Sequence, residues 1–451
     1  MRKNSLANEI LRRKRTAKRI KRRRLGKIFD QSKFRKTFQS IIQKYEIRRV
    51  QEYKSTLFEF LKTKKFIIGH EDRSLRIYIG DEFNLETNYN ETIEKISDIV
   101  YSIWINVGKT IVVDFTNCTK VDQSALFLLQ ILRLEIQGEW NRLDRFLTEI
   151  SISTKVEFVP SKISDVNLHL LLCGMSNNVE VSEGIVPIDS LGFLKGEKTR
   201  NYFLENRKGI NATKIVAYVN KCLRRNDFEF SEIGESDLTN LIGEVLNNAE
   251  DHSHFSTYYV TANYHHEADA TLDSGVVGEL NISFMNFGSS IYEGLEGTKE
   301  ENSAIYEIIS KIYDKVSGQS TFSKDNLFTL YALQDGISRL KYEDESRGTG
   351  TMKFINCFFS LGDYVNEAKN KQPRLTILSG KTYLICDNKY KPFEKDSRYF
   401  VSLNDQSDLF FPPNKSHLKD LKYAFPGTML SIKVFLNKEQ LNEKIIKNVT
   451  S

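Results

Sequence analysis

The chain is predicted to be an α/β protein, because strand-like and helix-like segments alternate through residues 66–180 and return after residue 206. Short runs rich in β-branched and aromatic residues, such as 110–115 (TIVVDF) and 257–265 (TYYVTANYH), are typical of strands. Between them, apolar residues recur at three- and four-residue spacing, which is typical of helices packed on a sheet. The length of 451 residues indicates about two or three domains.

Composition excludes several classes of protein. Hydrophobic residues make up 40% of the chain, enough for buried cores, and no run of eighteen apolar residues predicts a membrane span. The N-terminus is charged and lacks the apolar segment of a secretory signal. The five cysteines lie far apart without a C-x-x-C pair, which argues against zinc and disulfides. We therefore expect a cytoplasmic protein.

Residues 1–64 are predicted to form a basic, helical N-terminal region. Residues 1–24 hold twelve Lys or Arg and one Glu, a net charge of +11, which leaves −5 for the remaining chain. Such a cluster favours binding of nucleic acid or another polyanion through residues 2–27. A solvated arm and a surface for an acidic protein partner are the alternatives.

The next region, 65–180, is predicted to be a small α/β domain. Strands are expected at 75–80, 110–115 and 155–160, and helices at 90–105, 123–136 and 163–175. The stretch 114–129 (DFTNCTKVDQSALFLL) and the segment SDVNLHLLLCGM resemble signatures of STAS domains, the fold of anti-sigma-factor antagonists. In that family a phosphorylatable Ser follows the Asp, whereas Gln123 follows Asp122 here and Ser124 comes one place later. The resemblance therefore implies a structural or interaction domain instead of a phosphorylation switch.

The stretch 240–253 (NLIGEVLNNAEDHS) combines a helical apolar pattern with a polar stripe. Glu244 and Asn248 are four residues apart, so they lie one turn above the other on one helix face. Asp251 and His252 continue that side of the helix. Carboxylate and carboxamide oxygens on one stripe suit a metal-bound phosphate.

This stretch resembles the N-box of the GHKL (Bergerat-fold) ATPases, the superfamily of DNA gyrase, MutL and the sensor histidine kinases. Residues 279–291 (ELNISFMNFGSSI) are similar to the G1 box of that family, in which an Asp accepts a hydrogen bond from the adenine amino group. Asn286 stands at the position of this Asp, Gly288 and Ile291 match, and Ser290 replaces a Gly. The carbonyl oxygen of an Asn side chain can still accept from an amino group.

Residues 292–346 are predicted to be a long, mostly helical insert at the position of the ATP lid of the superfamily. The stretch 347–355 (RGTGTMKFI) then resembles the G2 box, in which Gly348 and Gly350 match. Glycines allow backbone N–H groups to approach phosphates closely, and the N-terminus of a following helix favours anions. Arg347 is either a cationic contact to the nucleotide or a surface residue of the lid.

The C-terminal segments complete the resemblance. A hairpin of two strands is predicted at 374–380 and 381–387, and Thr428, before the strand 429–436, matches a Thr that helps to hold adenine in these ATPases. The predicted domains are the N-terminal region 1–64, the STAS-like domain 65–180, a linker 181–205, the GHKL domain 206–440 as an α/β sandwich with a mixed sheet, and a tail 441–451.

The resemblance implies ATP and Mg²⁺ as cofactors. Asn248 would bind Mg²⁺ through its side-chain oxygen, and Glu244 would act as the general base for water. Asp251, His252, Asn286, Gly288, Ile291, Arg347, Gly348, Gly350 and Thr428 complete the expected nucleotide site.

We expect a slow ATPase that acts as an ATP-gated conformational switch in regulation or defence, together with a protein partner. A serine protein kinase acting on a separate STAS protein and a nucleotide-sensing scaffold without turnover are the alternatives. The sequence leaves open whether the chain forms a homodimer.

Overall fold

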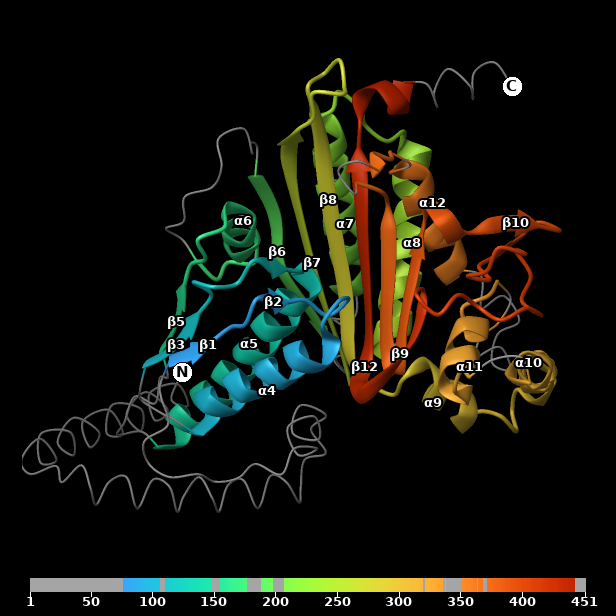
Figure 1. The fold of residues 1–451 in the computed structure, drawn as a ribbon, viewed down its shortest axis with the longest axis horizontal. Coiled ribbons are helices and arrows are strands. Elements are labelled where there is room, and N and C mark those ends of the chain that lie inside the picture. Colours follow the sequence, from blue (N-terminus) through green and yellow to red (C-terminus); the bar gives the residue numbers. More distant parts are fainter. Residues whose placement is uncertain are drawn as a thin grey trace, which may run out of the picture.

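The computed structural model describes residues 76–105, 110–147, 155–176, 188–197, 207–318, 321–335, 337, 350–362, 364–367 and 371–442. The predicted basic region 1–64, with its expected polyanion site at 2–27, lies outside the described residues, as do Arg347, Gly348 and most of the predicted tail. The described chain is a mixed α/β protein, as predicted (Figure 1).

A five-stranded sheet forms the centre of the structure (Figure 1). Its strands, in spatial order, are β6 (Ile188–Glu197), β7 (Ser253–Ala268), β8 (Val276–Gly288), β12 (Leu418–Leu436) and β9 (Arg374–Asp387). All four strand pairs are antiparallel, so the predicted mixed sheet is wrong. The strand β6 falls within the predicted linker 181–205, yet it forms one edge of this sheet and so belongs with the C-terminal part.

The predicted hairpin at 374–387 is also wrong, because these residues form the single strand β9. The turn of that predicted hairpin falls at Gly380. Gly380 does adopt a positive φ of +55°, which glycine tolerates at no steric cost, but the chain continues in the same direction. The facing strand β12 accommodates this by shifting its register twice between Asp420 and Thr428.

The region 76–176 contains the predicted small α/β unit. Three parallel strands, β1 (Arg76–Tyr78), β3 (Thr110–Asp114) and β5 (Lys155–Val159), form a sheet in the order β1-β3-β5. The helices are α4 (Tyr89–Ile105), α5 (Gln123–Leu147) and α6 (Ser164–Leu172), and a short parallel pair joins β2 (Glu82–Phe83) to β4 (Lys120–Val121). The alternation predicted from the sequence is thus confirmed, while the likeness to STAS domains stays a prediction.

Alternate residues of the central strands point to opposite sides of the sheet, and each side is covered by a separate core. Tyr258, Leu280 and Ile432 belong to a core formed with the helices α7 (Arg207–Arg224), α8 (Glu232–Asp251) and α12 (Gly350–Leu361). Tyr259 and Met285 belong to a second core formed with α4, α5 and β3. The α/β unit therefore covers one face of the sheet and the helices cover the other (Figure 1).

The insert after β8 is helical where it is described, as predicted. It contains α9 (Ile291–Gly297), α10 (Ser303–Ser317) and α11 (Lys324–Ala332). A 3-10 turn (Asn388–Tyr390) and a hairpin of β10 (Phe393–Lys395) and β11 (Arg398–Phe400) follow β9. Among the described helices, none combines the length and the apolar character that crossing a membrane requires.

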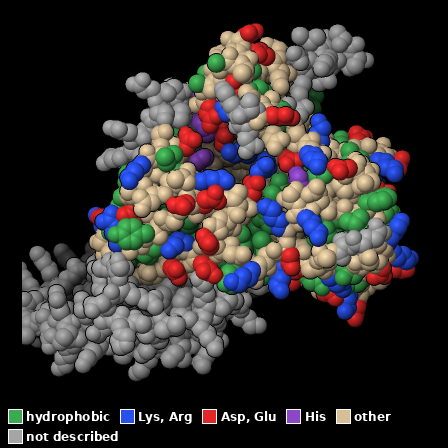
Figure 2. Space-filling model, viewed as in Figure 1, with side chains coloured by type: hydrophobic (Ala, Val, Ile, Leu, Met, Phe, Trp, Pro, Cys, Tyr) green, Lys and Arg blue, Asp and Glu red, His purple; other side chains and the backbone are tan. Residues whose placement is uncertain are grey.

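Charge is distributed differently on the described body and on the N-terminal arm. Figure 2 shows acidic and basic side chains intermixed over the face that carries α4 and α5. The sequence of residues 1–24, in contrast, carries charge of almost one sign. Any attraction to a polyanion is therefore expected from the arm.

Candidate functional site

The C-terminal end of α8 meets the N-terminal end of α12. The helix α8 begins after Ser231, whose side chain accepts a hydrogen bond from the N–H of Gly234. Glu244 and Asn248 are both exposed on this helix. The side-chain nitrogen of Asn248 donates a hydrogen bond of 3.3 Å to the hydroxyl of Thr351, in the first turn of α12. The predicted N-box residue thus lies beside the helix that follows the predicted G2 glycines.

Asn286, near the end of β8, joins α8 to two strands of the sheet. Its side chain is 2% exposed, and both ends of its carboxamide have partners within the protein. The nitrogen donates to the carbonyl oxygen of Ala249 at 2.8 Å. The oxygen accepts from the backbone N–H of Thr428 at 3.0 Å, and these two residues also face each other in the pairing of β8 with β12. Asn286 therefore holds two predicted site segments together.

Gly288 lies where two backbone segments are too close for any side chain. A Cβ atom at this position would lie 2.0 Å from the carbonyl oxygen of His252. The same carbonyl accepts a hydrogen bond of 3.1 Å from the N–H of Ser289, so the contact is an organised turn. The requirement for Gly here follows from the close approach of two backbone segments.

Two hydroxyl groups connect the end of β8 to β9 and β12. The hydroxyls of Ser379 and Thr428 share a hydrogen bond of 2.9 Å. Ser379, fully buried, also accepts from the backbone N–H of Ile291 at 2.8 Å. Ser290 is the N-cap of α9 and forms a capping box with Glu293, which explains why Ser stands where a Gly was expected.

The structure brings most of the predicted nucleotide-site residues to one corner of the central sheet. Asp251 ends α8 and His252 caps it, next to the turn at Gly288. Gly350 begins α12. The positions of Arg347 and Gly348 relative to this corner lie outside the described residues.

The chemistry of this corner suits a metal-bound phosphate. The amide oxygen of Asn248 and the hydroxyl of Thr351 are hard oxygen donors of the kind that Mg²⁺ accepts. The N-terminus of the twelve-residue helix α12 provides backbone N–H groups and a favourable dipole for an anion. The exposed carboxylate of Glu244, one turn before Asn248, lies on the same side of α8.

Sequence reasoning missed two contributors to this corner, Thr351 and Ser379. Thr351 directly follows Gly350, and a Thr in the first turn of a helix predicted to bind phosphate is a usable signal. The sequence carries no comparable signal for Ser379, because it lies within a strand and its hydrogen-bond partners, Ile291 and Thr428, are distant in the chain.

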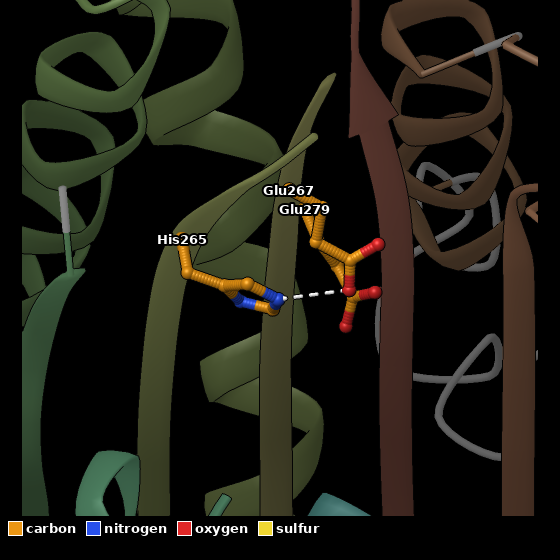
Figure 3. Close-up of side chains that lie close together, drawn as sticks. All are labelled: His265, Glu267 and Glu279. Atoms are coloured by element: carbon orange, nitrogen blue, oxygen red, sulfur yellow. Dashed lines mark hydrogen bonds and ion pairs between the residues drawn. The ribbon is translucent and has the colours of Figure 1, made fainter. Parts of the chain in front are cut away.

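A second polar cluster lies on the opposite face of the sheet. Figure 3 shows His265 and Glu267 of β7 and Glu279 of β8 pointing toward one another, with ligand atoms within 4.8 Å. Lys433 contacts Glu279 at 2.9 Å and Lys371 forms an ion pair with Glu267, so both carboxylates already have cationic partners. Burial acts to raise the pKa of Glu279, but Lys433 and His265 hold it well below its usual range. The cluster is therefore an ion-pair network within the protein.

Comparisons with known proteins give little guidance. No protein-family model matches the chain, and no solved structure matches it significantly. A curated phosphopentomutase of Clostridium novyi (strain NT) is 24% identical over 169 residues, which cover 37% of this chain and 42% of that relative. The chain thus spans about two fifths of the length of the curated relative that it matches.

Proposed function

We propose that the protein binds Mg·ATP at the corner between the end of α8 and the start of α12, and that it is a slow ATPase acting as a conformational switch. The observation that carries this proposal is the 3.3 Å contact between Asn248 and Thr351. It joins a side chain suited to Mg²⁺ to the start of a helix suited to phosphate, although 103 positions separate the two residues.

Each residue of the corner has a role in this proposal. Asn248 would hold the metal through its side-chain oxygen, while its side-chain nitrogen donates to the hydroxyl of Thr351. The metal, when bound, supplies positive charge that offsets the charge of the phosphate oxygens. Glu244 orients the attacking water and accepts its proton. The α12 backbone N–H groups hold the terminal phosphate.

Asn286 acts as a positioning residue in this scheme. Its carboxamide is engaged by Ala249 and Thr428 and is nearly inaccessible, so it fixes the wall of the nucleobase site instead of pairing with the base. Thr428, which is partly exposed, is the residue that this wall presents, and its hydroxyl shares a hydrogen bond with that of Ser379.

The arrangement of layers suggests how a bound nucleotide would act as a switch. The insert with α9, α10 and α11 leaves the sheet directly after Gly288, at the proposed site. On the other face, the hydroxyl of Ser124 in the α/β unit donates to the hydroxyl of Ser431 in β12 at 2.9 Å. Both the insert and the α/β unit thus contact strands that border the site. A movement of the insert on nucleotide binding would therefore change the position of the α/β unit, and with it the surface available to a protein partner.

The proposal is tested with purified protein, Mg²⁺ and ATP labelled on its terminal phosphate. Free phosphate and label on protein are followed together for the wild type, Glu244→Gln and Asn248→Ala. Asn247→Ala serves as the matched control, because Asn247 is the neighbouring exposed Asn and bonds to Lys208 on another side of α8. Phosphate release that is lost in the first two variants and kept in the control supports the ATPase.

Other outcomes would replace it. Label that moves to an added STAS-domain protein would make the protein a serine kinase. ATP binding without phosphate release or transfer would leave a nucleotide-sensing scaffold. A wild type that fails to bind ATP would refute the site itself.

A further inference from the structure

The three helices of the insert are attached to the central sheet in different ways. The helices α9 and α11 pack on the strand β9, whereas α10 packs mainly on α11 and lies outermost (Figure 1). The N–H of Ile291, at the start of α9, donates to the hydroxyl of Ser379 in β9. The buried side chain of Asn326 in α11 donates to the hydroxyl of Thr382 in β9 at 3.2 Å and to the carbonyl oxygen of Lys419 in β12 at 3.3 Å. The sheet therefore holds α9 and α11 directly, and it holds α10 mainly by way of them.

The ammonium group of Lys324, the first residue of α11, lies where these three helices meet. Its Nζ atom is 5.9 Å from the ring centre of Tyr292 in α9 and 5.2 Å from that of Tyr306 in α10. It is also 4.8 Å from the ring centre of Phe328 in α11. An ammonium within about 6 Å of an aromatic ring centre is attracted by the negative face of the ring. One cation is thus surrounded by one aromatic ring from each helix.

Hydrogen bonds join the same three helices around this cation. The Nζ atom of Lys324 donates to the hydroxyl of Tyr306 at 2.6 Å and lies 3.3 Å from a carboxylate oxygen of Glu296 in α9. The hydroxyl of Tyr306 donates to that same carboxylate oxygen at 2.5 Å. Burial acts to lower the pKa of Lys324, but its hydrogen bonds to Tyr306 and Glu296 raise it to about 12, so the group is charged at pH 7. Each of the three helices therefore supplies one member of a charged, hydrogen-bonded triangle.

This triangle can break at a lower cost than the attachment of α11 to the sheet. The side chains of Lys324 and Glu296 are 38% and 33% exposed, so water can replace their contacts when the helices separate. Asn326, in contrast, is fully buried, and loss of its hydrogen bonds would leave polar groups without water. The contacts that hold α10 are therefore the ones most easily released in the insert.

We propose that Lys324 is a latch, whose ammonium group holds α10 closed against α9 and α11, and that α10 opens when these contacts break. A connection from the latch to the nucleotide rests on the proposed function. Glu296 belongs to the short helix α9, whose first residue, Ile291, donates to Ser379. The hydroxyl of Ser379 shares a hydrogen bond of 2.9 Å with that of Thr428, in the wall of the proposed nucleobase site. A nucleotide held at this wall would therefore act on α9 and, through Glu296, on α10.

Hydrogen exchange of the full chain, followed by mass spectrometry without nucleotide, tests the latch itself. Lys324→Met keeps an unbranched side chain and removes the charge. We expect the amides of α10 to exchange about 10-fold faster in this variant, and those of β12 to exchange as in the wild type, because the lost contacts hold only the insert. Lys311→Met is the matched control, since Lys311 lies on α10 and pairs with Glu307 at 2.7 Å on the exposed surface. Its exchange should equal that of the wild type.

A second variant, Tyr306→Phe, removes one hydroxyl and keeps the aromatic ring. It should also speed exchange in α10, and adding it to Lys324→Met should change little, because the two side chains act through one shared contact. The latch is overturned if α10 exchanges no faster in Lys324→Met than in Lys311→Met. It is also overturned if exchange in β12 rises as much as in α10, because that result indicates a general loss of stability.

The same measurement with Mg·ATP separates the latch from the proposed function. We expect Mg·ATP to slow exchange in α10 of the wild type and to have less effect on α10 in Lys324→Met. Equal slowing of α10 in both proteins would overturn the connection between the latch and the nucleotide. A wild type whose exchange does not respond to Mg·ATP in any element would refute the proposed function, whereas the latch is decided by the comparison without nucleotide.

Discussion

Replacement of Asn286 by Asp separates two roles for this residue. In the GHKL resemblance an Asp at this position contacts adenine, so Asn286→Asp would improve the site. The structure gives Asn286 a different task, because its nitrogen donates to the carbonyl oxygen of Ala249 at 2.8 Å. A carboxylate has no proton to donate and would face that carbonyl with negative charge.

The expected cost follows from the two hydrogen bonds. The bond from the N–H of Thr428 is retained, since a carboxylate oxygen also accepts. The bond to Ala249 is lost at a site that is 2% exposed, and a buried acceptor without a partner costs about 1–3 kcal/mol. We therefore expect Asn286→Asp to lower the free energy of unfolding by about 1–3 kcal/mol near pH 7.

Urea unfolding followed by circular dichroism, at several pH values, measures this difference. The deficit should shrink at low pH, because a protonated carboxyl group regains a donor for the carbonyl oxygen of Ala249. Asn286→Ala, which removes both bonds, should cost more than Asn286→Asp. A variant with Asp that is as stable as the wild type at pH 7 would refute the positioning role.

Three further predictions concern packing and pH. Gly288→Ala should cost more than about 2 kcal/mol in urea unfolding, because its Cβ would lie 2.0 Å from a backbone oxygen, whereas Gly297→Ala, with nothing within 4 Å, should not destabilise the protein. Burial raises the pKa of Asp122 to about 6, so its contribution to the free energy of unfolding is present below pH 4 and is lost as the pH rises to 6. Asp122→Asn should remove this pH-dependent loss, which amounts to about 3 kcal/mol at most. A variant whose free energy of unfolding varies with pH as that of the wild type does would contradict this. Burial lowers the pKa of His169 to about 4, so its contribution to the free energy of unfolding is present above pH 6.5 and is lost as the pH falls to 4. His169→Gln should therefore lose less stability than the wild type at pH 4–5. Equal loss of stability in acid for the two proteins would contradict this.

The sequence predicted the local elements well and their assembly less well. Periodicity located the helices of the α/β unit and the helix that carries Asn248, since each has an apolar face set by nearby residues. The direction of strand pairing depends on contacts between distant segments, so the mixed sheet and the hairpin at Gly380 were predicted wrongly. One short strand is expected from the sequence within the linker, and β6 lies there, but its pairing with β7 as an edge of the central sheet depends on a distant segment that no local pattern reveals.

The same distinction holds for the candidate site. Glu244 and Asn248 could be grouped from their spacing on one helix, because helical geometry alone places them together. The contacts of Asn286 with Ala249 and Thr428 span 37 and 142 positions, and they assign it a positioning role that residue type does not disclose.

The binding of ATP to the full chain, with and without Mg²⁺, tests the central claim most directly. Titration calorimetry of the wild type, Asn248→Ala and Asn247→Ala measures it. We expect the wild type and Asn247→Ala to bind ATP more tightly with Mg²⁺ than without, and Asn248→Ala to lose that gain. Equal Mg²⁺ dependence in all three proteins, or no binding of ATP by the wild type, would contradict the proposed site.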